Sequence, residues 1–168
     1  MKSIFTLSIL AYNHPGVTSR ITSLFTRRGY NLESITAGRS EEIGKLRFII
    51  QIIVTPKNLE QITKQLYKIL DITKVSVVDK DNCVSKELAF IKVKKDKTLF
   101  NSDIFQIIRL FNGKVVDLNK QGFIIELVES HRMINSFIEL IPKGLISKIT
   151  RSGVIAIDKW PVINITNN

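Results

Sequence analysis

The loop at residues 13–17 has the residue types of a small-ligand site rather than those of a catalytic centre. It ends a predicted strand and begins a predicted helix, and N–H groups at a helix start carry partial positive charge. We expect the N–H groups of Gly16 and Val17 to point outward, where a carboxylate could accept hydrogen bonds. Gly16 lets a ligand approach the backbone, and the Asn13 amide could bind an ammonium or carboxylate group. A plain turn and helix start explains the loop equally well.

No set of side chains indicates catalysis or metal binding. The serines have no histidine partner by pattern, and no hydrolase, phosphate-loop or zinc-protease motif occurs. His14 and His131 are predicted to have capping or surface roles. Cys83 lies in a predicted turn beside Asp81, without the positive charges that lower a thiol pKa. One cysteine and two histidines supply no zinc ligand set and no disulfide, so we predict no catalytic residue, no metal site and a reducing compartment.

Composition restricts the class of protein further. A chain of 168 residues that is 44% hydrophobic can bury one moderate core or two small ones. The net charge of +10 could indicate nucleic-acid binding, but the charge is scattered, and we interpret the one dense run, residues 92–97, as a solvated loop. The N-terminus lacks signal-peptide or transit-peptide character, and no apolar run reaches the roughly 20 residues of a membrane span. We therefore expect a soluble protein that binds neither nucleic acid nor membrane.

The elements that would position this loop follow the same order twice. In the first half, apolar residues alternate in the strands and recur at helical spacing in the helices. Gly29 ends the first helix, and Thr55-Pro56 begins the second, with threonine as the N-cap. The predicted strands cover residues 3–10, 32–37, 46–54 and 75–78, and the predicted helices carry apolar faces over residues 17–25 and 59–69.

The second half repeats this order with little sequence similarity. Its predicted strands cover residues 88–93, 115–118, 123–128, 145–150 and 154–157, and its helices carry apolar faces over residues 104–111 and 134–141. The pattern predicts an α+β protein of two tandem ferredoxin-like βαββαβ modules, each with two helices on one face of an antiparallel sheet. We predict domains at residues 1–79 and 84–159 and a tail at 160–168. The central strands are apolar on both faces, so we expect modules or chains to pair.

The run Gly29-Tyr30-Asn31-Leu32-Glu33-Ser34-Ile35 resembles the small regulatory subunit of acetohydroxyacid synthase, also called acetolactate synthase. Residues 13–17, 25–28 and 151–157 extend the resemblance over essentially the whole chain. The run from Arg27 to Ile35 is specific to this family, whereas an Asn-x-Pro-Gly-Val turn occurs in ACT domains generally.

The resemblance implies an N-terminal ACT domain, a ferredoxin-like C-terminal domain and a large catalytic subunit as the partner. That subunit, with thiamine diphosphate, magnesium and FAD, joins two pyruvates, or pyruvate and 2-oxobutyrate, at the entry to branched-chain amino acid synthesis. The small subunit itself would bind no cofactor and catalyse nothing. It would raise the activity of the catalytic subunit and confer feedback inhibition, usually by valine.

The resemblance also implies where valine binds, namely between the ACT domains of a small-subunit homodimer. Carried over by motif, the site takes Asn13, Gly16 and Val17 from one chain and Asn31 and Leu32 from the other. This sequence departs from the family pattern at three nearby positions, namely Ala11, Tyr12 and Thr18, which bears on the choice among valine, leucine and isoleucine. The polar segment at residues 94–101 is also shorter than is usual in the family.

Two alternatives come from other classes of protein. A free-standing ACT-domain regulator would have the same ligand loop without a catalytic partner. An RNA-binding module of the RRM type shares the βαββαβ order, but its third strand should carry several aromatic residues, and residues 45–52 offer only Phe48. The amino-acid composition is of the kind encoded by AT-rich genomes, which fits a bacterial cytoplasm or a plastid stroma. If the protein acts in the plastid, we expect it to be encoded there.

Overall fold

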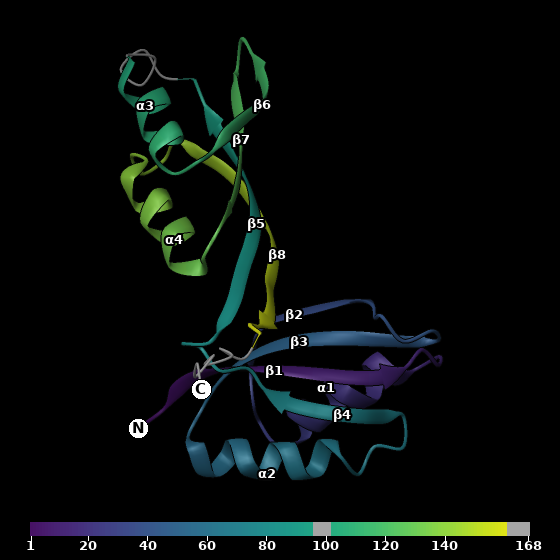
Figure 1. The fold of residues 1–168 in the computed structure, drawn as a ribbon. Helices are drawn as coiled ribbons and strands as arrows, with labels where there is room; N and C mark the ends of the chain where they lie inside the picture. The colour runs from purple at the N-terminus through teal and green to yellow at the C-terminus, as the bar shows by residue number, and fades with distance from the viewer. Residues whose placement is uncertain (96–101, 161–168) are drawn as a thin grey trace, which may run out of the picture. The chain divides into compact units, whose positions relative to one another are not determined.

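The computed structural model describes residues 1–95 and 102–160, and its contacts divide the chain into two units. Of the described residues, one unit comprises Met1–Val84 with residues 156–160, and the other lies within Ser85–Ile155. Each unit is built on a four-stranded sheet with two helices on one face (Figure 1). The α+β architecture of two ferredoxin-like modules is confirmed. The predicted domain limits stay predictions.

The first unit has the strand order β2-β3-β1-β4. Its elements are β1 (Ser3–Tyr12), α1 (Val17–Arg27), β2 (Leu32–Arg39), β3 (Lys45–Val54), α2 (Pro56–Leu66) and β4 (Ile72–Val77). The buried faces of both helices pack on alternate residues of β1 and β3, such as Ile9 and Ile50, because a strand turns every second side chain to the same face. The Thr55 hydroxyl accepts a hydrogen bond from the Asn58 N–H at 3.3 Å, so the predicted start of α2 is confirmed.

The second unit has the strand order β6-β7-β5-β8. Its elements are β5 (Cys83–Lys94), α3 (Ser102–Leu110), β6 (Lys114–Asn119), β7 (Gly122–Glu129), α4 (His131–Leu140) and β8 (Ile146–Asp158). Its core joins the helices to alternate residues of β5 and β7, including Ile91 and Ile125, which face each other across the two strands. In the described part of the chain, no helix is both long and apolar enough to cross a membrane.

Two sequence predictions for the strands β5 and β8 are wrong. The final two predicted strands form the single strand β8, because strand pairing continues through Gly153 with its positive φ of 79°. Cys83 begins β5 and Lys94 ends it, so neither lies in the predicted turn or loop. Lys92 and Lys94 are paired with Ile124 and Gly122 of β7, and this strand pairing overrides the polar composition of that end. The residues of the dense lysine run beyond Lys95 lie outside the described residues.

The sheet face opposite the helices in the first unit is mixed rather than uniformly apolar. Ile49 is buried there, but Ile53 is half exposed. Beside them the Arg47 guanidinium donates to the Ser8 hydroxyl at 3.2 Å, and the Gln51 amide donates to a threonine hydroxyl at 3.3 Å. The predicted apolar second face is therefore only partly present, and pairing of modules or chains stays a prediction.

Candidate effector site

The loop after β1 is held by backbone hydrogen bonds. The Asn13 N–H donates to the Gly44 carbonyl at 2.8 Å, and the His14 N–H donates to the Tyr12 carbonyl at 2.9 Å. Gly16 is the N-cap of α1 and has φ 83°, a left-handed conformation that other residues rarely adopt. Asn13 and Gly16 are exposed. The loop thus presents backbone to solvent at the positive end of a helix, as the sequence predicts.

The predicted set of outward N–H groups needs one correction. The Val17 N–H donates to the His14 carbonyl at 3.2 Å, because the tight turn folds this donor inward. The Val17 side chain is also buried in the core. In the described part of the chain, the N–H groups of Gly16, Thr18 and Ser19 have no acceptor, and no side chain caps the helix. The N–H groups of Gly16, Thr18 and Ser19 are therefore available to an anionic ligand, whereas that of Val17 is not.

Asp71, just before β4, holds the loop in place through His14 and Arg20, and we call this set of contacts the Asp71 brace. One of its carboxylate oxygens lies 3.1 Å from the His14 Nδ1, and the other accepts from the Arg20 Nε at 2.8 Å. Arg20 Nη2 lies 2.7 Å from this second oxygen and also donates to the Pro15 carbonyl at 3.4 Å. The hydrogen bond from His14 is the main cause that holds the pKa of Asp71 below its usual value, and Arg20 adds to it against the opposing effect of burial.

Sequence patterns missed this brace, since Asp71 and Arg20 are 51 residues apart along the chain. The signal that could have found it is topological. A strand that closes the sheet beside β1 must begin near the end of β1, and Asp71 directly precedes that strand. His14 has the exposed ring expected of a surface residue, yet the ring is also a partner of a carboxylate.

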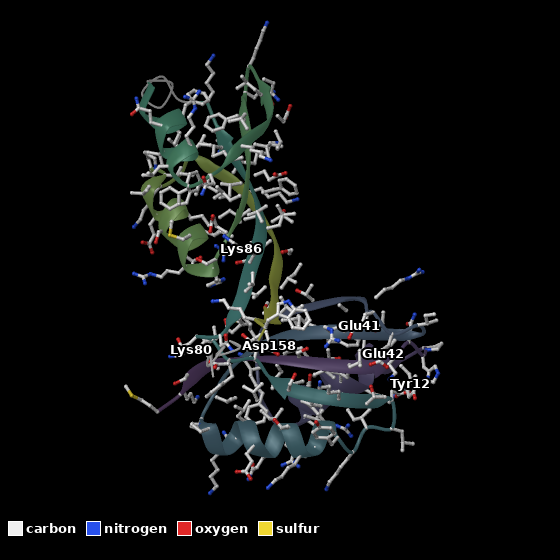
Figure 2. All side chains as sticks on the ribbon, viewed as in Figure 1. Tyr12, Glu41, Glu42, Lys80, Lys86 and Asp158 are labelled. Atoms are coloured by element: carbon white, nitrogen blue, oxygen red, sulfur yellow. The ribbon has the colours of Figure 1, made fainter. Side chains whose placement is uncertain are left out.

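Aromatic and charged side chains surround the mouth of the loop. The Tyr12 and His14 rings stack with centroids 5.7 Å apart, and the Lys45 ammonium lies 5.1 Å from the Tyr12 ring centroid. Lys45 also forms an ion pair of 2.6 Å with Glu42. Figure 2 shows Tyr12 and Glu42 at the same end of the sheet. The end of β1 is therefore a polar, structured rim.

The remaining predicted site residues lie at the other end of the same sheet. Leu32 is paired with Ile52, which is paired in turn with Phe5 near the start of β1. Asn13 lies eight residue positions after Phe5 along β1 and its loop, a distance of roughly 26 Å at about 3.3 Å per residue. Asn31 is exposed, and Leu32 is partly buried against the core. One chain thus brings Asn13, Gly16 and Val17 together but not Asn31 and Leu32.

A second polar cluster lies inside the second unit. Glu87 is only 4% exposed, and its carboxylate lies 2.9 Å from the His131 Nδ1 and 3.8 Å from the Arg151 guanidinium. Arg151 also donates to the side-chain amide oxygen Oδ1 of Asn135 at 2.6 Å. Thus His131 begins α4 and, beyond its predicted capping or surface role, pairs with a buried carboxylate. The cluster ties β5, α4 and β8 together, and each charged group has a partner.

Cys83 and the possible metal ligands offer no reactive centre in the described residues. Burial is the main cause that raises the pKa of the Cys83 thiol, and nearby Asp158 adds to this effect. The thiolate is therefore disfavoured. Within residues 1–95 and 102–160, no three His, Cys, Asp or Glu side chains group as metal ligands.

Comparison with known proteins assigns both units. Residues 7–74 match the family described as the AHAS small subunit-like ACT domain, and residues 86–160 match the family described as the small subunit of acetolactate synthase. The acetolactate synthase small subunit of Mycolicibacterium smegmatis is 37% identical over 156 residues, which cover 93% of this chain and 91% of that protein. The Bacillus subtilis small subunit is 38% identical over 157 residues, with 93% and 90% covered.

The fold agrees with these matches. A crystal structure of the acetolactate synthase small subunit from Thermotoga maritima aligns with a TM-score of 0.88 at 38% identity, over 95% of this chain and 99% of that one. The two family matches together span nearly all of the described residues, with the ACT match over the loop at residues 13–17. The chain belongs to the acetolactate synthase small-subunit family.

Proposed function

We propose that this chain activates a thiamine-diphosphate-dependent catalytic subunit of acetolactate synthase and makes it sensitive to valine. The catalytic subunit would form acetolactate and CO₂ from two pyruvates, or react pyruvate with 2-oxobutyrate, in branched-chain amino acid synthesis. Thiamine diphosphate, Mg²⁺ and FAD belong to that subunit in this proposal. Family membership supports the partnership. Either a bacterial cytoplasm or a plastid stroma is compatible with this role.

The observation that supports the proposed effector site is the geometry of the loop at residues 13–17 within one chain. The open N–H groups of Gly16 and Thr18 stand at the positive end of α1, where they can donate to the carboxylate of an amino acid. Asn13 beside them can bind the ammonium or the carboxylate through its amide. In the proposed dimer, Asn31 and Leu32 of a second copy complete the site, and the leucine supplies an apolar contact. Val17 shapes the loop from the core.

Inhibition requires that valine bind the less active arrangement of the complex more tightly than the active one. A coupling free energy of about 1 to 3 kcal/mol would give roughly 5- to 150-fold regulation. Selection among valine, leucine and isoleucine rests on one methylene group or its position, and such differences are worth only about 1 to 3 kcal/mol. Valine is therefore proposed as the effector on family grounds.

The test measures acetolactate formation by the cognate catalytic subunit with and without this chain across a valine titration. We expect stimulation by the wild-type chain and its loss with valine. The Gly16→Asp variant should stimulate but resist valine, because it adds negative charge and a side chain at φ 83° beside Arg20. Gly38→Asp is the matched control, since a Cβ there meets no atom within 4 Å. No stimulation at any valine concentration would contradict the proposal.

The two alternatives are separable. Phe48, the aromatic residue on which the RNA-binding alternative depends, is fully buried beneath the helices, so it cannot stack on a base. A free-standing ACT regulator would bind an amino acid without changing acetolactate formation. The same assay, together with a pull-down that recovers no large thiamine-dependent partner, would favour that alternative.

A further inference from the structure

The sheet face opposite α3 and α4 in the second unit contains a hollow of about 690 Å³. It lies at the end of the sheet where β5 ends and the β6–β7 turn begins. The residues that line it come from β5, β6, β7, β8 and the turn, and they are Lys92, Val93, Lys94, Lys95, Asp117, Asn119, Lys120, Gln121, Gly122, Phe123, Ile124 and Ser147. The candidate effector loop contributes none of them.

The register of the sheet explains why a hollow forms there. Lys92 and Lys94 alternate to the same face of β5 and stand opposite Ile124 and Gly122 on β7. Gly122 has no side chain to fill the space, and a Cβ there would overlap the Val93 carbonyl oxygen, so the strands approach closely. The Lys95 N–H donates to the Gln121 carbonyl at 2.7 Å and fixes the turn against the end of β5.

The charge of the hollow is unbalanced. Among the described residues that line it, four are lysines and one, Asp117, carries a carboxylate. Among the described residues, Lys92, Lys94 and Lys120 have no ion pair, whereas Lys86 on the same sheet is paired with Glu129 at 2.7 Å (Figure 2 labels Lys86). Like charges that converge on one space repel one another, and a bound anion would relieve that repulsion. Asp117 can offset only part of this charge.

We propose that this hollow is a binding site for a small, multiply charged oxyanion, such as a phosphorylated or polycarboxylate metabolite. Lysine ammonium groups provide three donors each on flexible stems and bind phosphate or carboxylate oxygens as point charges. The Ser147 hydroxyl and the Gln121 amide can add neutral hydrogen bonds. A nucleic acid fits less well, because Phe123, the aromatic residue among the described lining residues, is buried and offers no stacking surface.

The test is calorimetric titration of the full chain, without the catalytic subunit, with pyrophosphate and in a separate arm with citrate, at about 0.1 M salt where surface charges are partly screened. We expect one anion per chain. The variant Lys92→Gln/Lys120→Gln should bind about tenfold more weakly, since each exposed ion pair contributes a factor of roughly 1.4 to 5. The matched control Lys143→Gln/Lys148→Gln removes the same charge outside the hollow and should change the affinity less than about twofold.

Each outcome decides the proposal. Binding of pyrophosphate alone supports a phosphorylated ligand, and binding of citrate as well supports any polyanion of this size. Equal weakening in both double variants would mean a diffuse charge field and overturns the site, as would no binding of either anion at millimolar concentration. Circular dichroism verifies that the variants fold. Because no catalytic subunit or valine is present, failure here is distinct from failure of the proposed function.

Discussion

At the residue scale, the brace around Asp71 makes a prediction about the effector loop. Asp71→Asn should leave stimulation of the catalytic subunit intact but raise the valine concentration for half-inhibition by at least about fivefold. The reason is that the amide cannot hold His14 and Arg20 through the charged hydrogen bonds that fix the loop beside Gly16.

The matched control is Glu60→Gln, which makes the same chemical change in the exposed Glu60–Lys64 pair on α2. Its inhibition curve should overlay that of the wild type. A valine response of Asp71→Asn that matches the wild type would show that the loop keeps its shape without the brace. An equal rise in the valine concentration for half-inhibition in both variants would indicate a general charge effect.

The direction of the Asp71 pKa also predicts a dependence of stability on pH. The folded pKa lies below the ordinary value of 3.8, so the folded state favours the charged carboxylate. This stabilisation is present above the unfolded pKa and is lost as the pH falls through the folded pKa. Thermal unfolding of wild type and Asp71→Asn between pH 6 and pH 2 should show midpoints that converge below about pH 4. A gap that widens on acidification would contradict the assigned direction.

Residue types and spacing predicted the exposed Asn13 and Gly16 of the loop, since a Pro-Gly pair after an alternating strand has few other local structures. They did not predict that the Val17 N–H is consumed within the turn, because that depends on the dihedral angles of the turn. The role of Asp71 was not predicted for another reason. Its partners lie far away in sequence, and only the pairing of β4 with β1 brings them together.

At the element scale, the contact between β7 and β5 at Gly122 predicts a large effect of one methyl group. Gly122→Ala should destabilise the protein by about 1 to 3 kcal/mol, the usual range for overpacking. The added Cβ would overlap the Val93 carbonyl oxygen and lie 3.1 Å from the Lys94 Cα, and neither backbone atom can rotate away.

Urea unfolding followed by circular dichroism measures this loss. Gly38→Ala is the control, because a Cβ at Gly38 meets nothing within 4 Å. It should change the free energy of unfolding by less than about 0.5 kcal/mol. Equal stability of the two variants would mean that β5 and β7 separate at low energetic cost.

Periodicity predicted the existence and type of the elements well, since each half alternates between a period of 2 and a period of 3.6. Thr55 marked the start of α2 because an N-cap threonine followed by proline is a strong local signal. The ends of β5 and the continuity of β8 were missed because they depend on pairing with neighbouring strands. The predicted strand ends at Val93, and Lys94 looks like part of a lysine-rich loop until β7 is placed beside it.

At the scale of the whole molecule, the separation of Gly16 from Asn31 within one chain predicts complementation between two defective variants. Gly16→Asp and Asn31→Ala should each abolish valine inhibition alone, because every effector site in a homodimer then lacks one side. A mixed dimer of the two variants carries one site with both defects and one site with neither. Random association gives about half mixed dimers, so about one quarter of the sites should be intact.

Co-expression of both variants with the catalytic subunit, followed by equilibrium binding of labelled valine, measures this fraction directly. Recovery of about a quarter of the wild-type sites at wild-type affinity would mean that two chains share each site. This outcome is expected because Asn13 and Leu32 lie at opposite ends of the sheet within one chain. If each chain instead formed its own site, every chain in the mixture would carry one defect and no binding would return. Each variant alone would lose valine binding whether the site is formed by two chains or within one chain. Only the mixture of the two variants distinguishes these arrangements.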